Sequence, residues 1–284
     1  MQLSLRDQKA SDLKLDVKSN SLGKTIIAHQ YQTHPLKISR PFYLDPSSHY
    51  AYLYLRNNSP GLFAKDKLNI SINLHQDTQV YLTEQSATKV HPMTPGSKAE
   101  VNYKLHLQPK ATLELVSEPI IFYRDSALKQ TTQITMHPTA SLFWSEIILP
   151  GRLARGESYQ FRDYQNCLEV VSHEGKLWLK EQTFLLGKNN PFRNFNLFTS
   201  LPVLGTAIAI MPHVDLNLLV KTINNLNSQN AAGLTVATSV LPYDKGLLFK
   251  VIASQAQLIK KYYRSVINAL RQLNNQPLLP NIPK

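Results

Sequence analysis

The stretch that decides the fold reads Thr78-Gln-Val-Tyr-Leu-Thr-Glu-Gln-Ser-Ala-Thr-Lys-Val-His91. Val80 and Leu82 alternate with polar or aromatic residues, and this period of two predicts a β-strand with one buried face and one face that meets something polar. A nearly unbroken polar run, 84–89, follows the strand. Polar side chains are costly to bury unless they bond one another or a partner. The run is therefore either a sheet corner with locally satisfied side chains or part of a functional site.

The same strand–turn–strand pattern occurs three times in the middle of the chain. The copies are 72–82, 105–115 and 134–144, offset by 33 and 29 residues. A unit that recurs every 20–50 residues predicts stacked layers, as in a β-solenoid or a layered sandwich. An ordinary sandwich with similar hairpins is the alternative. If the layers stack, the polar segments that follow the three copies lie on one side of the molecule.

The rest of the chain predicts more strands and two helices. Aromatic and β-branched runs punctuated by proline, from residue 25 onward, indicate a mostly β fold. Apolar stripes of helical period predict two α-helices in the C-terminal third, at 215–227 and 254–273. The second helix either packs on the body or docks a partner. We treat the chain as a single domain, 1–284, with a polar N-terminal segment, 1–20, and a flexible tail, 277–284.

Composition limits the class of protein. The 284 residues are 43% hydrophobic, enough for a sizeable core, and the single cysteine, Cys167, rules out an internal disulfide and a cysteine-based zinc cage. The first residues lack the basic-then-apolar pattern of a signal peptide. The longest apolar run, Leu201 to Met211, is shorter than the roughly 20 residues that span a bilayer. We expect a cytoplasmic protein with no membrane partner.

The formal net charge is +12, which favours an acidic partner. The Lys and Arg residues are scattered, without the basic runs or aromatic–basic signature of nucleic-acid binders. We therefore expect an acidic protein partner and no nucleic acid. A basic nucleic-acid binder is the alternative, and its binding would weaken steeply with salt.

Catalytic and metal motifs are incomplete. Gly23-Lys24-Thr25 resembles the end of a phosphate-binding loop, but Lys18 stands where its first glycine belongs and a strand-like sequence follows. No Gly-x-Ser-x-Gly elbow occurs, and His173-Glu174 lacks a second His four residues on. Three histidines recur in the repeat and form either a metal-binding column or surface positions, and we predict no stable metal site; they are His75, His106 and His137.

The polar segments resemble the UreD/UreH family of urease accessory proteins. The residues that carry the resemblance are 82–90 (Leu-Thr-Glu-Gln-Ser-Ala-Thr-Lys-Val), 118–122 (Glu-Pro-Ile-Ile-Phe), 125–127, 130–132 and 151–157 (Gly-Arg-Leu-Ala-Arg-Gly-Glu). One departure is in 59–66, where the family's glycine-rich Gly-Gly-x-x-x-Gly-Asp segment has Pro60 and Lys65 in place of two glycines but keeps Asp66. This loop must therefore have a different shape.

The resemblance implies a non-enzymatic scaffold with a β-helical body and two helices. Such a protein binds accessory protein F, which holds the GTPase accessory protein G, and delivers nickel to apo-urease through an internal passage. It would have no tightly bound cofactor, only nickel in transit. The candidate path carboxylates are Asp66, Glu84, Glu118, Asp125, Glu146 and Glu157. The candidate supporting residues are Gln85, Thr88, Lys89, Arg152 and Arg155, and the candidate docking residues are Tyr262, Tyr263 and Arg264.

An enzyme is the alternative function. A β-helical carbohydrate-active protein would use a carboxylate pair such as Glu118 and Glu157 as acid and base or nucleophile. Sugar binding would separate this function from the scaffold.

Overall fold

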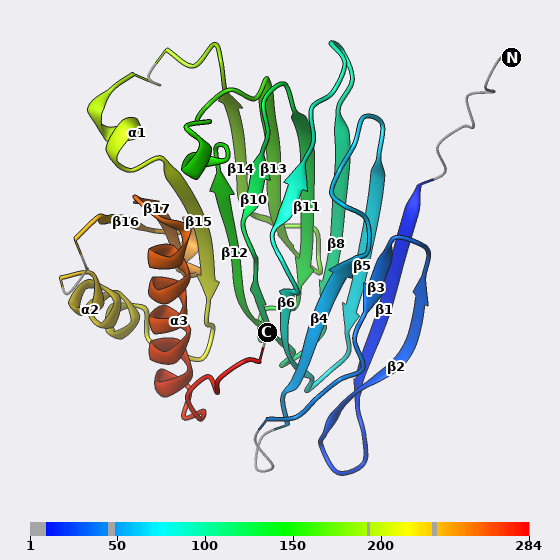
Figure 1. Ribbon diagram of the computed structural model, residues 1–284. Coiled ribbons are helices and arrows are strands. Elements are labelled where there is room, and N and C mark those ends of the chain that lie inside the picture. The colour runs from blue at the N-terminus through cyan, green and yellow to red at the C-terminus, as the bar shows by residue number, and fades with distance from the viewer. Residues whose placement is uncertain (1–9, 45–48, 192–193, 229–231, 284) are drawn as a thin grey trace, which may run out of the picture.

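The computed structural model describes residues 10–44, 49–191, 194–228 and 232–283. The chain winds into a β-solenoid of about four turns with two broad walls and three helices (Figure 1). Each turn places one strand in the first wall, a tight connection, and one strand in the second wall. The prediction of a stacked β body with two helices in the C-terminal third is confirmed.

The first wall is a seven-stranded sheet. Its strands in spatial order are β14 (Leu177–Leu186), β13 (Asp163–Ser172), β11 (Ala127–Met136), β8 (Ala99–Leu107), β5 (Lys67–Leu74), β1 (Ser11–Ser19) and β2 (Thr25–Gln32). The five strands from β13 to β1 are parallel, and the strand at each end is antiparallel. The polar N-terminal segment therefore contributes strand β1, while residues 1–9 lie outside the described part of the chain.

The second wall is a ten-stranded sheet. Its main path is β16 (Leu234–Val240), β17 (Leu247–Ala253), β15 (Val203–Ile210), β12 (Ser141–Leu149), β9 (Thr112–Val116), β6 (Gln79–Glu84), β4 (Ala51–Asn57) and β3 (Leu36–Ile38). Two short strands, β7 (Thr88–Val90) and β10 (Ile120–Phe122), pair in parallel with each other, and β10 also pairs with β12. They form the narrow side of the solenoid.

The three sequence copies stack in the register that their offsets predict. In the first wall Ile72 pairs with Leu105, which pairs with Ile134. In the second wall Leu82 pairs with Leu115, which pairs with Trp144. Equivalent repeat positions therefore form columns along the solenoid, and their side chains point to the same face because side-chain direction alternates along every strand.

The outer face of the second wall is covered by two of the helices, α2 (Leu216–Asn227) and α3 (Ala256–Leu273). The short helix α1 (Asn196–Ser200) precedes β15, and short 3₁₀ turns lie at η1 (Leu153–Arg155) and η2 (Pro242–Asp244). The two helices lie beside this wall (Figure 1), and an apolar cluster joins its outer face to α2 and α3. As a result Tyr81 and Thr83 are buried. Both faces of β6 are therefore buried, and α3 brings apolar side chains and the guanidinium of Arg271 to the outer one.

A buried ion pair fixes α3 to the sheet. Arg271 is 1% exposed and donates two hydrogen bonds to Glu114 of β9, at 2.8 and 2.7 Å. Its guanidinium also lies over the Tyr50 ring at 4.4 Å. The two charges can be buried because each satisfies the other with bidentate geometry.

The C-terminal tail follows α3 back along its own surface. The Leu279 side chain is buried, its N–H donates to Asn268 at 2.8 Å, and its carbonyl accepts from Arg264 at 2.6 Å. The composition predicts a flexible tail over 277–284. In the structure residues 277–280 contact α3, the carbonyl of Pro283 accepts from the Tyr54 hydroxyl of β4, and residue 284 lies outside the described part. In the described ranges, no helix is both long and apolar enough to cross a lipid bilayer.

Candidate functional site

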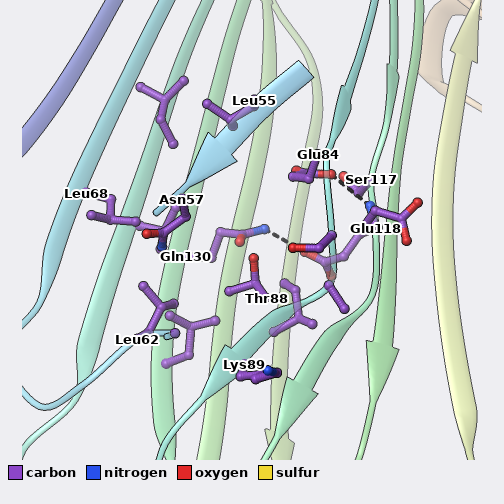
Figure 2. Close-up of a pocket in the computed structure, with 18 of the residues that line it drawn as sticks. Leu55, Asn57, Leu62, Leu68, Glu84, Thr88, Lys89, Ser117, Glu118 and Gln130 are labelled. Carbon is purple, nitrogen blue, oxygen red and sulfur yellow. Dashed lines mark hydrogen bonds between the residues drawn. The ribbon is translucent and has the colours of Figure 1, made fainter. Parts of the chain in front are cut away.

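A cavity of about 180 Å³ lies inside the solenoid, between the two walls and the narrow side (Figure 2). Its apolar lining includes Leu55, Leu68, Leu115 and Trp144. The polar residues that line it are Asn57, Ser59, Glu84, Ser86, Thr88, Lys89, Tyr103, Ser117, Glu118, Gln130 and Glu146. Figure 2 shows Thr88 and Gln130 directed toward the same space, with the Glu84 carboxylate beside it, bonded to the backbone of Glu118. The polar segments that the repeat predicted to lie together therefore supply much of one cavity.

Two of its carboxylates occupy the same repeat position. Glu84 ends β6, Glu146 lies in β12, and Ser117 is the equivalent residue between them by the offsets of 33 and 29 residues. Side-chain direction alternates along each strand. Leu82 and Trp144 point into the solenoid, so Glu84 and Glu146, two positions later, point into it as well. These equivalent positions form a row across the second wall. The row extends into the next two strands, because Glu146 pairs with Thr206 and Thr206 pairs with Lys250.

Glu146 is the most deeply buried carboxylate of the cavity, with 3% of its surface exposed. Its Oε2 accepts hydrogen bonds from the Tyr164 hydroxyl and from Gln130 Nε2, both at 2.6 Å, and from Asn166 Nδ2 at 3.3 Å. Burial raises the pKa of Glu146 to about 7, and the hydrogen bonds from Tyr164 and Gln130 oppose that rise only in part. The group therefore changes charge near neutral pH.

Glu84 and Glu118 lie at the side of the cavity that faces the narrow side and α3. Glu84 Oε2 accepts from the backbone N–H of Glu118 at 2.7 Å (Figure 2). The Glu118 carboxylate accepts from Lys260 of α3 at 2.8 and 3.0 Å. The helix that covers the sheet thus also holds one carboxylate of the cavity.

Of the supporting residues, Thr88 and Lys89 of β7 line the cavity. Gln85 does not: it turns the chain out of β6, and its N–H donates to Leu55 O at 3.0 Å.

Asp125 and Glu157 form a separate group outside the cavity lining. Glu157 is buried; its Oε1 accepts from the Arg124 N–H at 2.8 Å and its Oε2 from Arg152 Nε at 2.9 Å. Asp125 pairs with Lys188 at 2.5 Å. After β12 the chain leaves the wall, and Glu157 closes the resulting loop instead of lining the cavity with Glu84. The place of Asp125, Arg152 and Glu157 along a nickel path stays a prediction. Arg155 ends η1 in the same loop and is exposed.

Asp66 is also separate from the cavity. Its Oδ2 accepts from the Phe63 N–H at 2.8 Å, so the carboxylate closes the turn that replaces the glycine-rich segment. It lines a surface hollow together with Lys65, Lys67 and Lys98.

The docking candidates on α3 lie on its inner face or under the tail. Tyr262 is 4% exposed and Tyr263 is 0% exposed, so neither presents a surface to a partner. Arg264 donates to the carbonyls of the tail. The apolar stripe that contains both tyrosines packs on the sheet, and a docking role for this part of α3 stays a prediction.

Sequence reasoning missed the donors that face Glu146. Gln130 lies between the inward residues Leu128 and Thr132, and Asn166 pairs with Gln130 across the ladder. A polar residue at an inward position of a buried strand was the signal available for both. In the described ranges no group of three or more His, Cys, Asp or Glu side chains is arranged to hold a metal ion.

Comparison with known proteins extends over nearly the whole chain. The family model described as UreD urease accessory protein matches residues 9–284. The urease accessory protein UreD of Trichodesmium erythraeum (strain IMS101) is 47% identical over 277 residues, which cover 96% of this chain and 99% of that protein. UreD of Bacillus cereus (strain ATCC 10987 / NRS 248) is 28% identical over 86% of this chain and 87% of its own. UreD 2 of Brucella canis (strain ATCC 23365 / NCTC 10854 / RM-666) is 26% identical over 90% and 85%.

Proposed function

The chain belongs to the UreD family of urease accessory proteins, which act in urease maturation, and we propose that it does so as a non-enzymatic scaffold for nickel delivery. The scaffold binds accessory proteins F and G and apo-urease and passes nickel ions through its interior. The observation that supports the passage of nickel is the internal cavity, whose polar lining includes Glu84, Glu118 and Glu146.

The chemistry of the cavity suits an ion in transit. Carboxylate and hydroxyl oxygens attract a divalent cation, whereas several convergent imidazoles or thiolates would hold nickel far more firmly. The Glu146 carboxylate exchanges a proton near neutral pH, so a cation can replace that proton at a small free-energy cost. Lys89 at the cavity and Lys260 beside Glu118 offset part of the negative charge. The cavity would therefore attract a nickel ion without binding it tightly.

The carbohydrate-active alternative lacks its carboxylate pair. A glycosidase needs two carboxyl groups that face one substrate. Glu118 lines the cavity and is bound by Lys260, whereas Glu157 lies in the loop after β12 and is bound by Arg152. The structure therefore gives no support to joint action of these two residues.

Co-expression with accessory proteins F and G and apo-urease tests the proposal. Size exclusion reports assembly, and a nickel-dependent activation assay reports delivery. We expect Glu146→Gln to assemble normally but to activate urease several-fold more slowly, because the isosteric amide keeps the packing and cannot carry negative charge. The matched control Glu174→Gln changes an exposed carboxylate in a turn outside the cavity and should activate like the wild type. Failure of the wild-type chain to bind F would refute the scaffold, and normal activation by Glu146→Gln would refute its place on the path.

A further inference from the structure

The outer edge of β16 is an unprotected sheet edge. The strand ends the second wall and, among the described residues, forms a ladder with β17 alone (Figure 1). Its seven residues, Leu-Thr-Val-Ala-Thr-Ser-Val, include no charge and no proline, and four of them are β-branched residues of high strand propensity. The N–H and C=O groups on the outer side of such a strand are a template for another strand.

The other three terminal strands carry protective features. β14 contains Lys180 and Glu181 and joins its neighbour through a register shift at Val170/Val171. β2 pairs with β1 through a register shift at Asp16/Val17. β3 is only three residues long. Charges, bulges and short length are the usual means by which sheets avoid edge pairing, and β16 has none of them.

Side chains on both faces of β16 leave the edge accessible. Leu234 and Val236 are half-buried against the helical side, whereas Thr235, Ala237 and Ser239 on the opposite face are exposed. Val240 at the end of the strand is 46% exposed. The strand therefore presents a flat and uncharged strip.

We propose that β16 pairs with β16 of a second copy of this chain, antiparallel about a twofold axis at Ala237. In that register Leu234 lies opposite Val240, Thr235 opposite Ser239, and Val236 opposite Thr238. Each pair joins like with like: two aliphatic side chains, two hydroxyls that hydrogen-bond, and two β-branched side chains. Opposite residues also share a face, since the even-numbered residues point one way and the odd-numbered residues the other.

A second copy fits this edge better than a charged partner segment does. The strand has no charge for such a segment to pair with, and the adjoining turn carries one residue of each sign, Asp244 and Lys245. In a symmetric pair of two copies, each side chain of the strand lies opposite one of matching character. A single strand pair buries less than the roughly 1,200 Å² of a stable interface. The resulting dimer is therefore weak and reversible, and it strengthens with salt because salt screens the repulsion between two chains of net charge +12.

Cysteine cross-linking of the full chain tests the register. In a Cys167→Ser background, Ala237→Cys places two thiols opposite each other, where antiparallel Cα atoms are about 4.5–5.5 Å apart and within the span of a disulfide. We expect Ala237→Cys to form a covalent dimer under mild oxidation, and Thr235→Cys not to, since its partner is Ser239. Mixing Thr235→Cys with Ser239→Cys should restore the cross-link. Equal cross-linking of all these variants, or none with Ala237→Cys, overturns the proposal.

Sedimentation equilibrium supplies a second readout. Ala237→Lys should weaken dimerisation at least tenfold, because two lysines would meet at the axis. The matched control Gln30→Lys puts the same charge on the exposed edge strand β2 of the other wall and should leave dimerisation unchanged. Wild-type protein that stays monomeric at every concentration, or equal loss in both variants, contradicts the pairing. Urease activation by a strictly monomeric chain would remove this inference and leave the proposed function intact.

Discussion

The buried carboxylate of Glu146 makes stability depend on pH in a way that one substitution can isolate. The side chain is 3% exposed and its hydrogen-bond donors are neutral, namely Tyr164, Gln130 and Asn166. Burial disfavours the charged form, which raises the pKa from its ordinary value of 4.5 to about 7. Glu146→Gln keeps the size and polarity of the side chain and removes the titration.

The sign follows from proton binding. Between about pH 4.5 and 7 the folded state holds a proton on Glu146 and the unfolded state does not, so rising pH favours unfolding. The contribution of Glu146 is complete below pH 4.5, falls across this window and is constant above about pH 7. Each pKa unit corresponds to about 1.4 kcal/mol. The free energy of unfolding of the wild type, relative to Glu146→Gln, should therefore fall by about 3 kcal/mol between pH 4.5 and pH 8.

Urea denaturation of both proteins at several pH values measures this difference. Other titrating groups cancel in the comparison, because they are shared by the two chains. Glu174→Gln, at an exposed carboxylate, should show a difference from the wild type that changes little with pH. A wild-type-minus-Glu146→Gln difference that stays flat from pH 4.5 to pH 8 would refute the reasoning, since it would mean that Glu146 is ionised at its ordinary pKa.

Three further changes test the packing around the site. Glu114→Ala leaves the Arg271 charge buried and unpaired and should lower the free energy of unfolding by about 3–5 kcal/mol. The control Glu169→Ala breaks the more exposed pair with Lys180 and should lower it by less than about 1 kcal/mol. Urea denaturation of both variants measures the two values. Truncation after Gln276 removes the buried Leu279 and should lower stability by about 1.5–3 kcal/mol in thermal denaturation, and an unchanged midpoint would show that the tail does not hold α3. Gly151→Ala puts a Cβ 2.0 Å from the Glu157 carbonyl oxygen, so the loop must shift at a cost of about 1–3 kcal/mol, and wild-type stability would contradict this contact.

The repeat could be predicted from sequence because one physical rule sets it. Side chains alternate in direction along each strand, so a register error of one residue would turn the core outward. The offsets of 33 and 29 residues therefore appear unchanged in the ladders of Ile72, Leu105 and Ile134. The first coil escaped detection because the β2 strand and its connections separate β1 from β4, although Leu15 pairs with Ile72 and Leu53 with Leu82.

The residues of the site could be predicted where they lie on paired strands of the repeat, and not where they lie in the loops between them. Glu84 and Glu146 share a repeat position, and both line the cavity. Glu157 was grouped with them from its place after the third copy, but no ladder continues there, and the loop geometry sends its carboxylate to Arg152. The burial of Tyr81 and Tyr262 depends on which face α3 covers, and strand periodicity does not determine where a helix 170 or more residues later will pack.

Strand pairing also explains why the polar groups form a continuous row instead of isolated buried defects. The repeated coils place Glu84 and Glu146 at equivalent inward positions, and the antiparallel strands β15 and β17 extend the line across the second wall to Thr206 and Lys250. At its far end Lys250 pairs with Glu181 of β14, so the row runs between the two walls of the solenoid. An apolar residue at position 146 would avoid a desolvation cost of about 3 kcal/mol at neutral pH. A buried carboxylate kept at that cost is expected where charge inside the solenoid has a use, and a cation that moves along the row is the use we propose.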